Sequence, residues 1–114
     1  MAATGLASHF TGKSPAVLAT YRAILEQARA LGPVKEESKK TSIHLVRATA
    51  FAGVATRKKW LVLTLKSASD LRSPRIVKHE QASARRWHLE VKLDEPSQVD
   101  REVRAWLNAA YDIS

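Results

Sequence analysis

The sequence predicts an α+β fold, a two-layer sandwich in which two helices cover one face of an antiparallel sheet. Apolar residues recur at helical spacing near both ends of the chain, whereas the middle alternates apolar and polar residues with the period of a strand. Each of these segments is apolar on one side only. Both helices are therefore expected on the same face of a sheet of four or five strands, with the other face left to solvent.

The N-terminal helix is expected to begin after Ser14, which offers a cap, and at Pro15, where a missing N–H costs nothing. An apolar stripe follows as far as Leu31, and Gly32-Pro33 ends the helix. We expect residues 1–12 to be a loose N-terminal segment and residues 13–114 to form a single domain. A chain of 114 residues can bury a core of its own without disulfides or metals.

The middle of the chain predicts successive strands joined by short connections. Val34 to Lys40 forms a charged connection, and Gly53 indicates a bulge or a close approach of backbone. Residues 75–79 are either a short edge strand or an irregular segment. The other expected strands span residues 41–47, 51–54, 60–66 and 86–93, with a hairpin connection at 56–59.

The C-terminal helix carries an apolar stripe from Val99 to Tyr111. Ser97 and Asp100 resemble a capping box with Asp in place of Glu, after the break at Asp94-Glu95-Pro96. The open sheet face is then expected to carry alternate polar residues of the strands, with a basic run at a hairpin tip. Those residues are His44, Lys66, Arg86, His88, Glu90 and Lys92, with Arg57 to Lys59 at the tip.

Charge is distributed unevenly along the chain. Residues 39–92 hold thirteen basic and three acidic groups, a formal charge of +10, whereas the net charge of the whole chain is +8. This segment coincides with the expected sheet, so one layer should be positive. The excess could serve solubility alone or form an anion-binding surface. No cysteine is present, which fits a reducing cytoplasm and excludes thiol catalysis and cysteine-ligated metal. No segment is apolar enough to span a membrane.

Nucleic acid is the favoured partner because a positive surface displaces phosphate counterions, and an outward Trp60 could stack on a base. A protein-interaction module, or a site for a small acidic ligand with Arg47, Arg86 and His88 as donors, is the alternative. The candidate binding residues are Lys40, Arg47, Arg57, Lys58, Lys59, Trp60, Lys66, Arg85, Arg86 and His88.

An enzyme is the weaker hypothesis, and no cofactor is expected. His44, His79 and His88 could be combined with Glu80 and Glu90, but their spacing matches no metal or acid–base motif. The glycines are too scattered for a phosphate-binding loop, and none frames a nucleophilic serine. We therefore expect binding rather than catalysis.

A family resemblance rests on short segments spread from about Phe10 to the end of the chain. They are Lys40-Thr41-Ser42-Ile43, Phe51-Ala52, Ser73-Pro74-Arg75-Ile76, Arg86-Trp87-His88 with Val91, Val99-Asp100, Trp106-Leu107 and Ala110-Tyr111. The order and spacing of these segments resemble the pattern of a family of small bacterial domains of unknown function, often labelled "predicted transport protein". The stretch from Trp87 to Tyr111 is also similar to the YjbR-like double-wing group, whose fold is related to that of frataxin (CyaY).

The resemblance implies an α-β-sheet-α domain and no established activity. Nucleic-acid binding, suggested for YjbR-like proteins, agrees with the charge. Frataxin-like iron binding uses an acidic ridge on the first helix and the neighbouring strand, and the first helix of this chain has only Glu26 between Arg22 and Arg29. Hard cations prefer clustered carboxylates, so iron binding is not expected.

Overall fold

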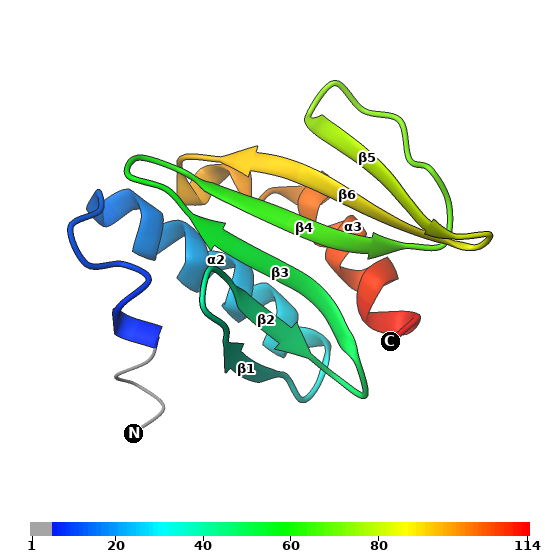
Figure 1. Cartoon of the computed structure of the whole chain (residues 1–114), viewed down its shortest axis with the longest axis horizontal. Coiled ribbons are helices and arrows are strands. Elements are labelled where there is room, and N and C mark those ends of the chain that lie inside the picture. The colour runs from blue at the N-terminus through cyan, green and yellow to red at the C-terminus, as the bar shows by residue number, and fades with distance from the viewer. Residues whose placement is uncertain (1–5) are drawn as a thin grey trace.

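The computed structural model describes residues 6–114, which form one sheet and two main helices (Figure 1). All neighbouring strands pair antiparallel, and the order across the sheet is β1-β2-β3-β4-β6-β5. The elements are α2 (Pro15–Leu31), β1 (Lys35–Ser38), β2 (Ile43–Val46), β3 (Ala50–Thr56), β4 (Leu61–Ser67), β5 (Ile76–Ser83), β6 (Arg86–Leu93), the 3₁₀ turn η1 (Pro96–Gln98) and α3 (Arg101–Asp112).

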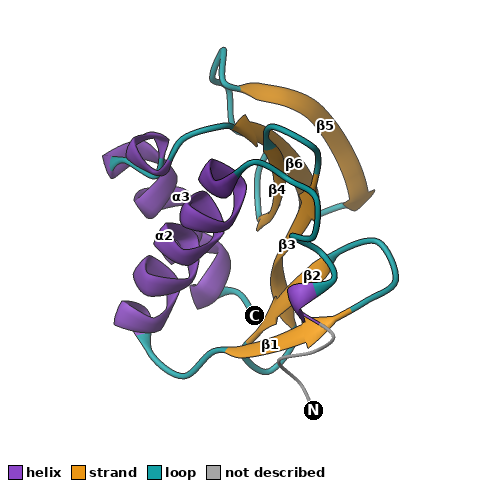
Figure 2. Cartoon of the chain, turned by 90° about the vertical axis from the view of Figure 1, so that its left-hand side faces the viewer, coloured by secondary structure: helices purple, strands orange, loops and turns teal. Residues whose placement is uncertain are grey.

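The two helices pack on one side of the sheet, as Figure 2 shows. We call the opposite side of the sheet the open face. The α+β class, the terminal positions of the helices and the antiparallel pairing are as the sequence predicts. Neither of the long helices in residues 6–114 is long and apolar enough to cross a membrane.

The number of strands corrects the expectation of four or five, because the sheet has six. The missed strand is β1, which lies in the segment expected to be a charged connection. Its sequence, Lys-Glu-Glu-Ser, has no apolar residue, and it joins the sheet as an edge through its pairing with β2. Glu36 turns toward the helices, where its carboxylate accepts a hydrogen bond from Tyr21 and pairs with Arg29 at 3.1 Å.

The core lies between the helices and the inner side of the sheet. Strand β4 alternates strictly, and Leu61, Leu63 and Leu65 are buried against the helix layer. Val17, Ile24 and Ala28 of α2 and Val103, Leu107 and Ala110 of α3 supply the facing apolar stripes. The burial of one side of each strand fixes the register, and so it decides which residues remain on the open face.

Local contacts define both ends of α2 and the start of α3. Ser14 Oγ accepts a hydrogen bond from the Ala16 N–H at 3.4 Å, as the sequence predicts for the cap of α2. Gly32 has a positive φ of 153°, and a side chain there would overlap the Tyr111 hydroxyl. The expected Ser97 cap is wrong, since Asp100 caps α3 by accepting from the Val103 N–H at 3.2 Å. Ser97 lies inside the preceding 3₁₀ turn.

The residues just before α2 pack against the sheet edge and the helix. The buried ring of His9 places its Nε2 2.9 Å from Ser38 Oγ, and the Phe10 ring centroid lies 5.3 Å from that of Tyr21. Lys13 Nζ donates to Thr56 Oγ1 and to the His9 carbonyl oxygen. The first five residues of the expected loose segment lie outside the described part of the chain.

Candidate anion-binding face

The open face is built from the alternate residues of the paired strands. On β4, Thr64 and Lys66 point away from the buried leucines. Gly53 of β3 pairs with both His44 of β2 and Thr64 of β4, so the three form one row across the sheet. In the next row Lys66 pairs with His88 of β6. Residues far apart in the sequence are therefore brought onto one surface.

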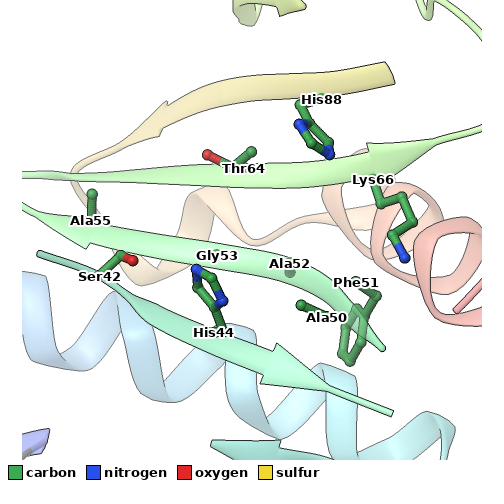
Figure 3. Close-up of a pocket in the computed structure, with 10 residues that line it drawn as sticks. All are labelled: Ser42, His44, Ala50, Phe51, Ala52, Gly53, Ala55, Thr64, Lys66 and His88. Carbon is green, nitrogen blue, oxygen red and sulfur yellow. The ribbon is translucent and has the colours of Figure 1, made fainter. Parts of the chain in front are cut away.

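A hollow of about 310 Å³ lies in the middle of this face (Figure 3). Its polar side chains come from β2, β4, β6 and the connection before β2, and its floor is β3. The lining residues are Ser42, His44, Ala50, Phe51, Ala52, Gly53, Ala55, Thr64, Lys66 and His88.

The hollow exists because β3 presents almost no side-chain bulk to the open face. An irregularity in the β2–β3 pairing follows the Leu45–Ala52 pair. The successive residues Phe51 and Ala52 are both buried, and the Phe51 ring packs edge-on against Tyr111 of α3 at 5.3 Å. A bulge of this kind interrupts strict alternation. Together with Gly53, which has no side chain, it leaves backbone and methyl groups as the floor.

Lys66 is the charged group of the hollow. Its Nζ donates to Thr49 Oγ1 at 2.8 Å and makes no ion pair with any carboxylate in residues 6–114. Burial of the ammonium, and secondarily the nearby Arg86 guanidinium, lower the pKa of Lys66 from its ordinary value. An anion placed beside Lys66 would favour the charged ammonium and so oppose the lowering of its pKa, because it offers an opposite charge where Arg86 offers a like one.

The other cations are less concentrated than the sequence charge suggests. Lys78 and Lys92 are on the strands of the open face, but Lys78 lies 3.8 Å from Glu90, and Glu80 lies 3.7 Å from His88. Carboxylates on β5 and β6 thus neutralise part of the face. Lys66, Arg86 and Lys92 are the strand cations of the face with no carboxylate partner within the described residues.

The other basic residues that were predicted to bind an anion, apart from Arg47, lie at two opposite ends of the sheet. The hairpin end holds the β1–β2 connection and the β3–β4 hairpin, with Lys40 and Arg57 to Lys59. The turn end holds the β5–β6 turn, with Arg85 and Arg86, close to Lys66. Seven residues of β4 connect the two ends, a span of about 24 Å at the usual rise per residue of a strand.

Trp60 lies at the hairpin end and on the open face. Its partly buried ring lies under Lys92, whose Nζ is 4.4 Å from the ring centroid. Lys92 pairs with Val62, on the opposite side of the sheet from the buried Leu93. One side of the indole is therefore already in contact with a cation. The expected outward stacking surface is present only in part.

Arg47 is not brought to the open face. Its Nη1 donates to the Tyr111 carbonyl oxygen at 3.0 Å, and its guanidinium carbon lies 4.5 Å from the centroid of the Tyr111 ring. These contacts join the β2–β3 turn to the end of α3. Arg47 therefore has a clear structural role on the helix side.

The histidines are divided between the two sides of the sheet. His44 and His88 both line the hollow, but β3 and β4 separate their strands. His79 pairs with the buried Leu89, and its Nδ1 lies 2.5 Å from Asp70 Oδ1. Within residues 6–114 no three His, Asp or Glu side chains converge as a set of metal ligands.

Sequence reasoning missed most of the hollow. Ser42, Ala50, Ala55 and Thr64 carry no motif, and their shared position depends on strand register. The available signals were the alternation that places His44, Lys66 and His88 on the open face, and Gly53, because a glycine inside a strand often marks a close approach to the backbone.

Fold and surface together define a small α+β domain with an uncovered, hollowed sheet face and unpaired cations on it. The chain belongs to the family described as Domain of unknown function (DUF5655), whose model matches residues 6–114. No curated protein and no solved structure matches the chain. The match agrees with the expectation of a small domain of unknown function.

Proposed function

We propose that this protein is a non-enzymatic binding domain and that its open face binds single-stranded nucleic acid. The observation that carries the proposal is the set of strand cations without carboxylate partners in residues 6–114, namely Lys66, Arg86 and Lys92. They lie on the sheet face that neither helix covers. Exposed cations at both ends of the sheet extend the positive track.

The shape of the open face favours a single strand over a duplex, because no helix or two-stranded ribbon protrudes from the described part of this face. Reading a duplex groove requires a protruding helix or two-stranded ribbon, whereas a single strand can lie along a groove and expose its bases. The open face offers a hollow and an indole ring instead. The resemblance to YjbR-like proteins suggests nucleic acid in general, without a preference for single strands.

The test is a salt series with a labelled oligothymidylate and the full chain. Lys58 and Lys59 are exposed, and within residues 6–114 their side chains make no hydrogen bond or ion pair. For a single strand, each phosphate contact adds about 0.7 to the slope of log affinity against log salt. K58Q/K59Q should therefore reduce the slope by about 1.4 if each lysine contacts one phosphate.

The matched control is R101Q/R104Q, which removes the same charge from exposed positions of α3. It should leave the slope unchanged, because α3 lies on the covered side of the sheet. Undetectable binding at 50 mM salt would refute the proposal. An equal decrease of the slope in the two double variants would show that the oligonucleotide is attracted non-specifically by the net charge of the protein.

A small acidic ligand is the second candidate, and the hollow is the observation that favours it. Its volume is at the lower end of the range of about 300–1,000 Å³ for small-molecule sites. A carboxylate ligand of this kind should bind with little dependence on Lys58 and Lys59. Saturable binding of citrate or succinate that K66Q abolishes, without oligonucleotide binding, would establish this alternative.

A further inference from the structure

The hollow differs in character from the cationic ends of the sheet. Its floor, around Gly53 and Ala55 of β3, is flat and uncharged, and its ammonium group lies toward one end, at Lys66. A site for a bare anion would place donors around a centre. This site places a flat surface beside a cation, which suits a ligand with a planar ring and a negative group.

The sides of the hollow suit a heteroaromatic ring. His44 from β2 and His88 from β6 lie on opposite sides of the floor, as Figure 3 shows, and the His44 ring leans toward Gly53. Histidine is among the side chains on which bases stack. The hydroxyls of Ser42 and Thr64 can donate to or accept from the polar edges of a base.

We propose that the hollow is a nucleotide subsite, with a nucleobase over Gly53 between His44 and His88 and its phosphate at Lys66 and Arg86. The inference rests on the proposed function and deepens it by naming the unit of the strand that enters the hollow. A free mononucleotide and one residue of a strand share this chemistry. The volume of about 310 Å³ favours one nucleotide rather than a longer segment.

The floor can be filled without disturbing the fold. A Cβ added at Gly53 would meet only the His44 Cδ2, at 3.7 Å, and Gly53 does not have a positive φ. Gly53→Ala should therefore keep or raise stability, since glycine weakens a strand interior. Ala55→Val adds two methyl groups to the same floor. Ala82→Val makes the identical change on exposed β5, outside the hollow, and serves as the matched control.

Calorimetric titration of the full chain with adenosine monophosphate, uridine monophosphate, adenosine and inorganic phosphate tests the assignment. We expect both nucleotides to bind more tightly than adenosine and at least tenfold more tightly than phosphate. Gly53→Ala and Ala55→Val should each weaken nucleotide binding at least tenfold, whereas Ala82→Val should not. Lys66→Gln should bring the affinity for the nucleotides closer to that for adenosine, because only Arg86 then contacts the phosphate, and it should leave adenosine binding unaffected.

Several results would overturn the inference. They are no nucleotide binding at millimolar concentration, phosphate binding as tight as nucleotide binding, and unchanged affinity in Ala55→Val. The labelled oligothymidylate, titrated into the same variants, separates this failure from failure of the proposed function. Oligonucleotide binding that Ala55→Val does not affect would refute the subsite alone. Nucleotide binding without oligonucleotide binding would retain the subsite and refute the strand-binding face.

Discussion

The contact between Trp60 and Lys92 fixes the position of a charged group on the open face. The Lys92 ammonium lies 4.4 Å from the indole centroid, a geometry that holds the lysine over the ring. This contact places the Lys92 ammonium at the hairpin end, where the β3–β4 connection is already cationic. Trp60 therefore positions a cation on the open face.

We predict that Trp60 and Lys92 are energetically coupled. A cation–π contact at a partly exposed site contributes about 0.5–1 kcal/mol. Urea denaturation of Trp60→Leu, Lys92→Gln and the double variant should give a coupling of this size. Lys78→Gln in place of Lys92→Gln is the control, because Lys78 lies on edge strand β5 and pairs with Glu90. Strictly additive losses for Trp60 and Lys92 would show that the ring and the ammonium act independently.

Among the elements, α3 depends on a cap that also anchors the connection between β4 and β5. Asp100 accepts from the Val103 N–H, and Arg75 Nη1 contacts both of its carboxylate oxygens, at 2.9 and 3.0 Å. The hydrogen bond from Arg75 is the main reason that the pKa of Asp100 is lowered. One carboxylate thus holds the start of the helix and the residue that precedes β5.

We predict that Asp100→Ala lowers the free energy of unfolding by about 1 kcal/mol at pH 7, the usual cost of a lost cap. Because the folded-state pKa lies below the unfolded value, this contribution is fully present above about pH 4. It is lost as the pH falls through the folded pKa. Urea denaturation of wild type and variant from pH 7 to pH 2 should therefore converge at the acid end.

Asp112→Asn is the control for this pH dependence, since Asp112 is an exposed carboxylate in the last turn of the same helix. It should not destabilise α3, because an acidic group is unfavourable near a helix C-terminus. A difference between wild type and Asp100→Ala that stays constant down to pH 2 would contradict a role for the ionised carboxylate.

The elements also show where sequence reasoning succeeds. The first helix has a cap, a proline at its first position, an apolar stripe and a terminating glycine, and all four agree with the structure. Strands β4 and β6 alternate because one side is buried. Strand β1 has no such pattern, and most of β5 is exposed. The sequences of these two edge strands therefore give little indication that they pair with the sheet.

At the scale of the whole molecule, the site is less predictable than the fold because it depends on register and on absent side chains. The polar residues of the open face follow from alternation, whereas the hollow follows from a bulge at β3 and from Gly53. Arg47 illustrates the other difficulty. Its basic side chain looks suitable for an anion in the sequence, yet the fold directs it to a helix carbonyl.

The two cationic ends of the sheet predict that affinity depends on oligonucleotide length in two phases. A short strand can reach one end, whereas a strand long enough to cover about 24 Å of β4 can reach both. Linking two contact sites through one ligand makes the second contact intramolecular, so affinity should rise sharply at that length and then level off. Fluorescence anisotropy with oligothymidylates of 2 to about 16 nucleotides, the upper site size of comparable single-strand binders, covers the range.

Substitutions at the two ends make the length series decisive. K58Q/K59Q removes charge at the hairpin end and R85Q/R86Q at the turn end. Each double variant should weaken the sharp rise, because one end loses two of its cations, while the shortest oligonucleotides keep their affinity for the unaltered end. A smooth increase with length in wild type, altered equally by both variants at every length, would mean that the strand does not cross the open face from end to end.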